Sequence, residues 1–293
     1  MKIGIVGLGS MGFGMASSLR RAGHVISGAD VNPEAMMRLQ AEGAVTDMPP
    51  SALEALVVVV LNAAQVQEVL FSAEGFAPKL AKGAVVICCV TVAPEFARAT
   101  ADRCEALGLL YLDAPISGGS VKAAAGKLSV MASGTAGAFA AARPMLDATA
   151  EKVFEMGDRA GMGSAMKAVN QMLAGVHIAA MAEAVTFGMT QGIAPETFLK
   201  VIPNCAGTSW MLENRAPHVV SGDYTPHSAV DIWLKDLGIV LDAARASKFA
   251  APLTAAALQQ FVAASGMGFG RQDDAAVAKV YARNASLTLP GAG

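Results

Sequence analysis

The sequence lacks the charge and the aromatic content that mark several large classes of protein. Its 22 basic and 24 acidic residues leave a formal net charge of -2, no basic run occurs, and only 5% of the residues are aromatic. Proteins that bind nucleic acid or an anionic membrane surface usually present a strongly basic patch. We therefore expect neither nucleic acid nor a membrane among the partners of this protein.

Cysteine and long apolar runs are scarce as well. The four cysteines are Cys88, Cys89, Cys104 and Cys205. No pair has the spacing of a metal or redox motif, which favours a reducing compartment. The longest apolar runs, residues 55–61 and 84–93, fall far short of the roughly 20 residues that cross a bilayer. Because the N-terminal residues enter a strand-like run without a signal peptide, we expect a soluble, cytoplasmic protein.

The 293 residues are enough for two domains, and the pattern changes between the two halves of the chain. In the first half, short apolar and β-branched runs alternate with helical stretches. The expected strands are residues 3–6, 25–29, 56–61, 85–90 and 109–112, with a further strand at 127–133 and helices at 11–22 and 33–42. Near-continuous apolar strands form parallel sheets that helices cover on both faces. The pattern predicts an α/β fold with a Rossmann-like, doubly wound parallel sheet.

The second half has a helical pattern. Residues 164–191 are rich in Ala, Met, Val and Leu and contain no proline, which predicts one long helix. Further helices are expected at residues 195–202, 229–248, 252–266 and 274–284. Glycines cluster at residues 157–163, between the two patterns. We therefore expect one domain at residues 1–160 and an all-helical domain at residues 161–293.

A glycine-rich turn follows the first expected strand and opens the first expected helix. Its sequence is Gly7-Leu8-Gly9-Ser10-Met11-Gly12. In a dinucleotide-binding turn of this spacing, the first glycine makes the turn, the second admits the pyrophosphate, and the third lets helix and strand pack closely. An ordinary strand-to-helix turn is the alternative. The position at the first strand-helix junction favours dinucleotide binding at a helix N-terminus.

An acidic residue, Asp30, ends the second expected strand. A carboxylate at this place can accept hydrogen bonds from the adenosine ribose hydroxyls and would repel a 2′-phosphate. No arginine occurs at residues 31–37 to bind such a phosphate, so the sequence favours NAD over NADP. The alternative is that Asp30 only caps the helix that begins near Pro33.

A second constellation follows the expected strand at residues 109–112. Its sequence is Asp113-Ala114-Pro115-Ile116-Ser117-Gly118-Gly119. Ligands of open parallel sheets bind outside the carboxyl ends of the strands, and a Ser-Gly-Gly turn offers N–H groups and a hydroxyl to a small carboxylate. A purely structural turn explains the same residues about as well.

Two further groups of polar residues lie in the helical half. Lys167, Asn170 and Gln171 share one face of the long apolar helix, and a lysine in such a place is a candidate general base for an alcohol. A solvated stripe is the alternative for this face. Lys235 and Asp236 are adjacent in another apolar helix, where a surface ion pair is the simplest interpretation.

These segments together resemble the β-hydroxyacid dehydrogenase family. The resemblance covers nearly the whole chain and rests on the glycine turn, on residues 113–119 and 163–170, and on Lys235-Asp236-Leu237. It implies a Rossmann-like domain that binds NAD, a helical C-terminal domain that completes the active-site cleft, and a homodimer or homotetramer. The implied partner is a small-molecule hydroxy acid.

The resemblance also implies a role for each matching position. Lys167 becomes the catalytic acid and base. Ser117, Gly118 and Gly119 bind the substrate carboxylate, and Asn170 binds the substrate. The residues expected to bind the cofactor are Gly7, Leu8, Gly9, Ser10, Met11, Gly12, Asp30, Asn62, Thr91 and Lys235.

The chain departs from the family pattern at several positions. It has Leu61-Asn62-Ala63 where Met-Leu-Pro is common, Val90-Thr91 where Ser-Thr is common, and Gln171 where a second Asn is usual. Within the family it is most similar to members that act on L-threonate. We therefore expect oxidation of a four-carbon polyhydroxy acid, L-threonate, at C2, with polar contacts from Asn204, Thr208, Ser209 and His177 around a specificity segment at residues 207–211.

Three alternatives remain open. The substrate could be 3-hydroxyisobutyrate, whose apolar tail would not need the four polar side chains. The reaction could also be the reduction of a 3-oxo acid such as tartronate semialdehyde, which all the named residues would serve. A dinucleotide-binding sensor without catalysis is the alternative from a different class. The four histidines, His24, His177, His218 and His227, show no metal-ligand spacing with carboxylates, so we expect no metal and an activity that survives a chelator.

Overall fold

The computed structural model of the protein describes residues 1–45 and 48–291. The chain divides into two compact units, Met1–Lys167 and Ala168–Gly293. The division falls inside a long helix, whereas the domain boundary proposed from the sequence, between residues 160 and 161, precedes that helix.

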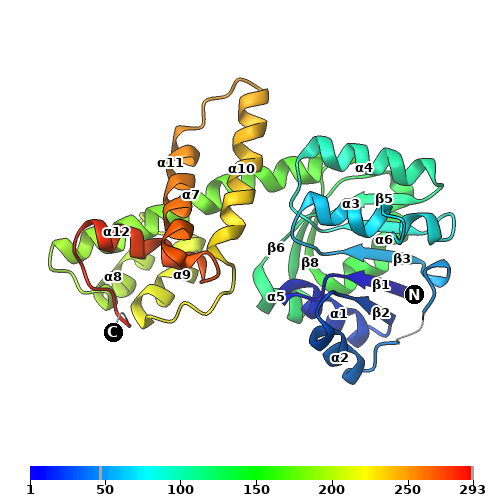
Figure 1. The fold of residues 1–293 in the computed structure, drawn as a ribbon, viewed down its shortest axis with the longest axis horizontal. Coiled ribbons are helices and arrows are strands. Elements are labelled where there is room, and N and C mark those ends of the chain that lie inside the picture. Colours follow the sequence, from blue (N-terminus) through cyan, green and yellow to red (C-terminus); the bar gives the residue numbers. More distant parts are fainter. Residues whose placement is uncertain (46–47, 292–293) are drawn as a thin grey trace. The chain divides into compact units, whose positions relative to one another are not determined.

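The first unit contains a central sheet of parallel strands in the order β2-β1-β3-β4-β5 (Figure 1). The strands are β1 Lys2–Val6, β2 Val25–Ala29, β3 Ala55–Val58, β4 Val85–Cys88 and β5 Leu110–Asp113. The expected strands and the doubly wound α/β class are confirmed. β3 and β4 are buried along their whole length, which explains why their sequences are continuously apolar instead of alternating.

The order of the strands indicates at which edge of this sheet a ligand is expected to bind. From β1 the chain passes outward to β2 and then returns to β3 on the other side of β1, so the direction of winding reverses beside β1. Ligands of such sheets bind at this switch point, outside the carboxyl ends of the strands. Val6 of β1 pairs with Ala29 of β2 and with Val58 of β3, so the segments that follow these strands emerge at one edge.

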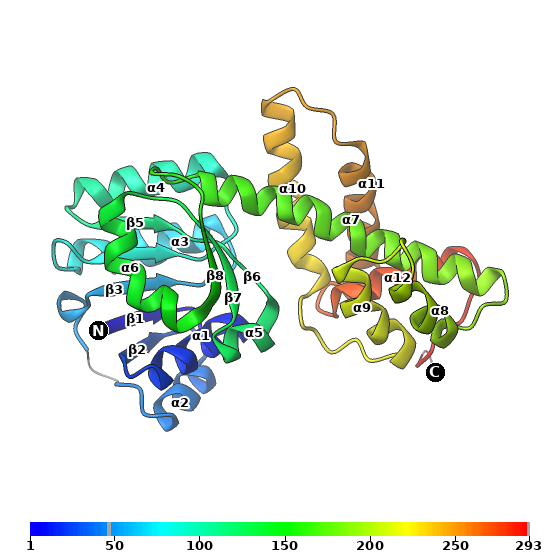
Figure 2. The same ribbon diagram turned by 180° about the vertical axis from the view of Figure 1, so that it is seen from behind.

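Helices cover both faces of this sheet (Figure 2). They are α1 Ser10–Arg21, α2 Pro33–Ala41, α3 Ala63–Phe71, α4 Pro94–Ala106 and α6 Ala136–Thr149, with 3₁₀ helices η1 Pro50–Ala52 and η2 Ala77–Lys79. A further helix, α5 Gly119–Ala125, packs against α1. Ile5 of β1 lies in one core cluster with Leu19 of α1, and Val58 of β3 lies in another with Leu70 of α3. Each face of the sheet therefore has its own apolar core.

A second, smaller sheet has the order β6-β7-β8. Its strands are β6 Ile116–Ser117, β7 Leu128–Ala132 and β8 Ala150–Glu155. The sequence predicted β7 but missed the other two strands. β6 has only two residues, and β8 is largely exposed and carries charged side chains, so neither has the apolar run that identified the other strands.

The second unit is helical. Its elements are the continuation of α7 Met162–Thr190, then α8 Pro195–Val201, η3 Ile202–Asn204, α9 Trp210–Ser221, α10 Val230–Ala246, α11 Pro252–Ala264, the π-helical turn η4 Ser265–Phe269, η5 Asp274–Val277 and α12 Ala278–Asn284. Among the described residues of this unit, the only strand-like pairing is an isolated bridge between Ala229 and Asp273. The long helix and the all-helical character are confirmed.

One helix of this unit, α9, was missed by the sequence analysis. Its N-cap is Ser209, whose hydroxyl accepts a hydrogen bond from the Leu212 amide at 3.1 Å. Pro217 lies inside the helix, and a proline in a helix interior is a signal against helix formation. The capping serine was the local signal that could have identified the helix.

The composition of α7 satisfies a criterion that the sequence analysis did not apply. An 18-residue window within Met162–Thr190 has a mean hydropathy of 1.4, so this helix is long and apolar enough to cross a membrane. In the structure, 44% of that window is buried, and Ile178, Ala182 and Val185 belong to the apolar core of the second unit. The core helix of a soluble protein meets the same criterion.

Candidate active site

The glycine turn lies between β1 and α1, at the switch point of the sheet. Gly7 has φ +91°, and a Cβ there would lie 2.4 Å from the Val59 carbonyl oxygen. A Cβ on Gly12 would lie 1.8 Å from the Gly7 carbonyl oxygen, so the third glycine is required for close packing of the turn. A Cβ on Gly9 would meet nothing within 4 Å. The turn thus leaves open space at the N-terminus of α1, where a pyrophosphate fits.

Asp30 follows β2 and is hydrogen-bonded to the glycine turn. Its carboxylate accepts the Leu8 amide at 2.5 Å and the Asn32 amide at 2.7 Å. The cap of α2 is Asn32, whose side chain accepts from the Glu34 amide. The alternative role of Asp30 as the cap of this helix is therefore excluded, and its carboxylate lies beside the turn expected to hold the dinucleotide.

Asn62 and Thr91 follow the next two strands of the sheet. Asn62 is the N-cap of α3 and accepts the Gln65 amide at 2.9 Å. Thr91 lies between β4 and α4 and is half-buried. Both residues, which the resemblance assigns to the cofactor, follow the carboxyl ends of their strands, β3 and β4.

The Ser117-Gly118-Gly119 turn leads from β6 into α5. Gly118 has φ +135° and Gly119 has φ +76°, a conformation that disfavours residues with a Cβ at both positions. Ser117 pairs with Ser129 of β7. A Cβ on Gly119 would meet nothing within 4 Å, whereas one on Gly118 would lie 3.0 Å from the Lys122 side chain. The turn therefore holds a serine hydroxyl and backbone N–H groups with open space at Gly119, which suits a carboxylate ligand.

Asp113, at the end of β5, fixes the start of α7. Its buried carboxylate accepts hydrogen bonds from the backbone amides of Gly161 and Ser164, both at 2.9 Å, and from the Ser164 hydroxyl at 2.6 Å. The Ser133 hydroxyl is a fourth donor at 3.2 Å. Burial raises the pKa of Asp113, and these hydrogen bonds oppose that effect.

The same junction explains two glycines of the sequence. Gly161 has φ +105°, and a Cβ on Gly163 would lie 2.3 Å from the Met131 carbonyl oxygen. The first turn of α7 therefore packs directly against the backbone of β7. Lys167 stands one turn further along and is only 7% exposed. The alternative of a solvated stripe at this position is wrong.

In the second unit, polar side chains of α7 contact α10. The Asn170 amide donates to Gln171 Oε1 at 2.9 Å, and Gln171 Nε2 donates to Asp236 Oδ2 at 2.5 Å. Lys235 Nζ lies 2.8 Å from Asp236 Oδ1. Asp236 is only 2% exposed, so interpreting Lys235 and Asp236 as a surface ion pair was wrong.

This chain of contacts orients Asn170. Gln171 is 7% exposed, and its amide has one partner on each side. A buried amide held at both ends has a defined rotamer, and so does the Asn170 amide bonded to it. A Cβ on Gly175 would lie 2.8 Å from Leu237, which shows how closely α7 and α10 pack.

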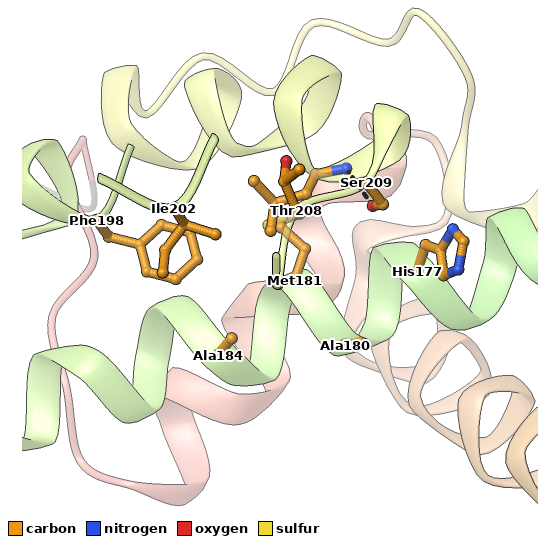
Figure 3. Close-up of a pocket in the computed structure, with 10 residues that line it drawn as sticks. His177, Ala180, Met181, Ala184, Phe198, Ile202, Thr208 and Ser209 are labelled. Carbon is orange, nitrogen blue, oxygen red and sulfur yellow. Dashed lines mark hydrogen bonds between the residues drawn. The ribbon is translucent and has the colours of Figure 1, made fainter. Parts of the chain in front are cut away.

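A cavity of about 420 Å³ lies further along α7, within the second unit (Figure 3). Its lining includes His177, Met181, Phe198, Thr208 and Ser209. Three of the four polar side chains predicted to contact the substrate therefore share one cavity, whereas Asn204 is not part of its lining.

Several of these polar side chains already have local partners. Thr208 Oγ1 donates to Glu213 at 2.8 Å, Ser209 caps α9, and Asn204 donates to the Lys200 carbonyl at 3.0 Å. The His177 ring has no hydrogen bond to the described part of the chain. Of the four, His177 is the side chain whose polar atoms are most available to a ligand.

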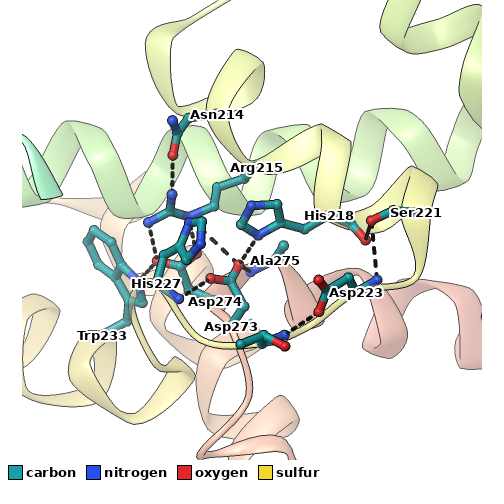
Figure 4. A network of polar contacts seen from close by, with 11 residues as sticks. Asn214, Arg215, His218, Ser221, Asp223, His227, Trp233, Asp273, Asp274 and Ala275 are labelled. Atoms are coloured by element: carbon teal, nitrogen blue, oxygen red, sulfur yellow. Dashed lines mark hydrogen bonds and ion pairs between the residues drawn. The ribbon is translucent and has the colours of Figure 1, made fainter. Parts of the chain in front are cut away.

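A polar network elsewhere in the second unit corrects an expectation about the histidines (Figure 4). His218, His227 and Asp273 come together, with one possible ligand atom from each within 4.8 Å of the others. The expectation that the histidines form no cluster with a carboxylate was therefore wrong, because two of them lie beside Asp273. Asp273 is 46 residues from His227 and 55 from His218, so short-range spacing could not show the cluster.

Comparisons with known proteins agree with this arrangement. The NAD-binding domain of 6-phosphogluconate dehydrogenase matches residues 2–157. The domain described as NAD-binding of NADP-dependent 3-hydroxyisobutyrate dehydrogenase matches residues 161–281. Fold, glycine turn and domain matches together define a nicotinamide-dinucleotide-dependent oxidoreductase with a helical second domain.

Full-length relatives make the assignment narrower. L-threonate dehydrogenase of Cupriavidus necator is 48% identical over 293 residues, which cover 99% of this chain and 98% of that protein. L-threonate dehydrogenase of Escherichia coli K12 is 49% identical over 295 residues, which cover 99% and 97%. A crystal structure described as 3-hydroxyisobutyrate dehydrogenase from Salmonella typhimurium has a TM-score of 0.91 and 48% identity, and covers 96% of this chain and 99% of that one. The chain belongs to the 3-hydroxyisobutyrate dehydrogenase-like family of hydroxyacid dehydrogenases.

Proposed function

We propose that the protein oxidises L-threonate at C2 to the 2-oxo acid 2-dehydro-L-erythronate, with NAD as the hydride acceptor. Similarity over the full length to L-threonate dehydrogenases supports the substrate. The observation that carries the chemistry is the buried Lys167, which lies one turn beyond the Asp113-anchored start of α7.

Lys167 is the proposed acid and base. As a neutral amine it takes the proton of the C2 hydroxyl while the carbon-oxygen bond becomes a carbonyl. The nicotinamide ring, when bound, accepts the hydride that leaves C2. In the opposite direction the protonated amine returns the proton to the carbonyl oxygen, so the same residue serves both directions.

The Ser117-Gly118-Gly119 turn is the proposed site for the substrate carboxylate. Its hydroxyl and N–H groups can donate to both carboxylate oxygens, and the two positive-φ glycines hold the backbone in this form. A carboxylate fixed here limits the orientations of C2.

Asn170 is the proposed second contact to the substrate. Because Gln171 and Asp236 hold its amide, Asn170 presents a fixed hydrogen-bonding group and not a freely rotating one. Preorganised polar groups of this kind favour a substrate with matching hydroxyls and disfavour one that lacks them.

Asp30 supports NAD over NADP. Its carboxylate is held beside the glycine turn through the Leu8 amide. A negative charge at this position accepts ribose hydroxyls and repels a 2′-phosphate.

A second candidate substrate is 3-hydroxyisobutyrate, or tartronate semialdehyde in the direction of reduction. The Salmonella typhimurium structure described as 3-hydroxyisobutyrate dehydrogenase is as similar in sequence as the L-threonate dehydrogenases, which favours keeping this candidate. Lys167, Asn170 and the Ser117 turn serve either substrate class.

We also propose a cytoplasmic location and a homodimer or homotetramer. The four cysteines are free thiols, which suits a reducing compartment. Val169, Leu173 and Phe187 of α7 are exposed apolar side chains that an interface between copies would cover.

A substrate panel tests the proposal. The purified protein is assayed at 340 nm with NAD and with NADP against hydroxy acids of three to five carbons, and the L-threonate product is identified by mass spectrometry. We expect NADH formation with L-threonate and higher kcat/KM with NAD than with NADP. Cofactor binding without NADH formation on any acid would instead support the non-catalytic sensor.

A further inference from the structure

Two histidines and a buried aspartate form a compact cluster in the second unit (Figure 4). His218 lies in the last turn of α9, His227 in the segment between α9 and α10, and Asp273 is the N-cap of η5. The proposed reaction uses none of the three.

The geometry of the cluster is that of a metal site with an open side. His218 Nδ1 lies 2.8 Å from Asp273 Oδ1, and the two imidazole rings are 4.8 Å apart at 86° to each other. Asp273 is fully buried, His218 is half-buried and His227 is exposed, so water can complete the coordination from the side of His227. Two imidazoles and one carboxylate are a ligand set that zinc and similar divalent ions prefer.

Backbone groups already hold the carboxylate in place. Asp273 Oδ2 accepts the His227 amide at 2.9 Å, and Oδ1 accepts the Ala275 amide at 3.1 Å. These hydrogen bonds orient the carboxylate, as outer hydrogen bonds do for the ligands of a metal ion.

The charges around the cluster favour a cation. Asp223, Asp273 and Asp274 surround it, and Arg215 is the guanidinium that offsets them, at 2.5 Å from Asp274 and 3.8 Å from Asp273. Three carboxylates against this guanidinium leave an excess of acidic side chains around the cluster.

We propose that His218, His227 and Asp273 bind one divalent transition-metal ion of the zinc class. The ion would link α9, the following segment and η5, which are far apart in sequence. Its role would be to stabilise the second unit and not to take part in hydride transfer.

A competing explanation uses the same residues without a metal. The His218 ring would then only be hydrogen-bonded to Asp273, at 2.8 Å, and His227 would be a bystander. This explanation predicts no tight zinc binding and no change in Tm when zinc is added.

Zinc titration of the full chain separates the two explanations. Protein purified without a polyhistidine tag is treated with EDTA, dialysed and titrated with zinc chloride by calorimetry at pH 7.5, with magnesium chloride as a control ion. We expect one zinc per chain, no comparable magnesium binding, and a rise in Tm of about 5 °C or more at zinc well above Kd.

Two matched variants complete the test. His227→Ala removes an exposed ring and keeps the backbone amide that bonds Asp273, so the fold should persist while zinc affinity falls at least about 10-fold. His177→Ala removes a histidine of the same unit outside the cluster and should bind zinc normally. Absence of one-to-one zinc binding in the natural sequence, or equal zinc affinity in the two variants, would overturn the proposal. Neither result depends on the substrate, so the proposed dehydrogenase activity stands or falls separately.

Discussion

In each unit a buried carboxylate contacts α7, but one carboxylate binds its backbone and the other binds a side chain. Asp113 accepts backbone amides and hydroxyls at the first turn and so fixes where the helix begins. Asp236 accepts the side-chain amide of Gln171 two turns further on and so fixes a rotamer. The first contact determines where the backbone bearing Lys167 lies, and the second determines how Asn170 points.

Removing the two contacts should therefore have different effects. A displaced start of α7 moves Lys167, the proposed acid and base, so both kcat and the free energy of unfolding should fall. A freed amide leaves the backbone in place and weakens only one contact to the substrate. The predictions below follow this order.

Removal of the Lys167 amine, on the helix whose start Asp113 holds, should have the largest effect. Lys167→Ala should lower kcat about 100-fold or more, since a positioned acid or base typically supplies 10²–10⁴ in rate. Steady-state assays with L-threonate and NAD measure this. Lys82→Ala, an exposed lysine of the same unit, is the control and should be unaffected. Near-normal turnover without Lys167 would remove it from the mechanism.

Removal of the Asp113 carboxylate, which holds the start of α7, should have the second-largest effect. Asp113→Ala leaves the Gly161 and Ser164 amides without their acceptor, which should cost about 3 kcal/mol or more of unfolding free energy. The displaced helix start should lower kcat about 10-fold or more. Urea unfolding and steady-state kinetics measure the two effects, with the exposed Asp102→Ala as control. A variant with unchanged stability would show that Asp113 does not hold the helix.

Removal of the Gln171 amide, which joins Asp236 to Asn170, should weaken substrate binding. Gln171→Leu frees Asn170 and removes the amide donor of Asp236, so KM for L-threonate should rise about 10-fold while kcat changes less. KM for NAD should rise less than KM for L-threonate, because Lys235 still pairs with Asp236. The exposed Gln191→Leu is the control. A fall in kcat with unchanged KM would place Gln171 in the chemical step instead.

Metal removal should have the smallest effect on activity. The proposed mechanism uses none of the three residues of the zinc cluster, so EDTA should leave kcat unchanged at 25 °C and lower only the Tm of protein that carries zinc. Parallel assays and thermal scans before and after dialysis test this. A loss of kcat that zinc restores would contradict the metal-independent mechanism.

The sequence was sufficient wherever the determining interactions are local. The glycine turn could be predicted because its spacing is local in the sequence and Gly12 must pack against Gly7, and β3 and β4 because complete burial makes their runs apolar.

Contacts between distant segments could not be predicted. The Lys235-Asp236 pair was visible in the sequence, but not the fact that Asp236 faces α7 and lies buried. The same limit hid the anchor role of Asp113 and the cluster of His218, His227 and Asp273, because each depends on how separate elements pack. The local sequence pattern predicts the helix or strand, but which of its faces is buried depends on the tertiary packing.

The ratio of kcat/KM for L-threonate to that for 3-hydroxyisobutyrate, measured with NAD on the natural sequence, tests the central claim most directly. In the proposed site, the oriented Asn170 amide would favour a substrate with several hydroxyls, because an apolar tail would leave this amide unpaired. We predict a ratio of at least about 100. Equal values for the two acids would contradict a site built for a polyhydroxy acid.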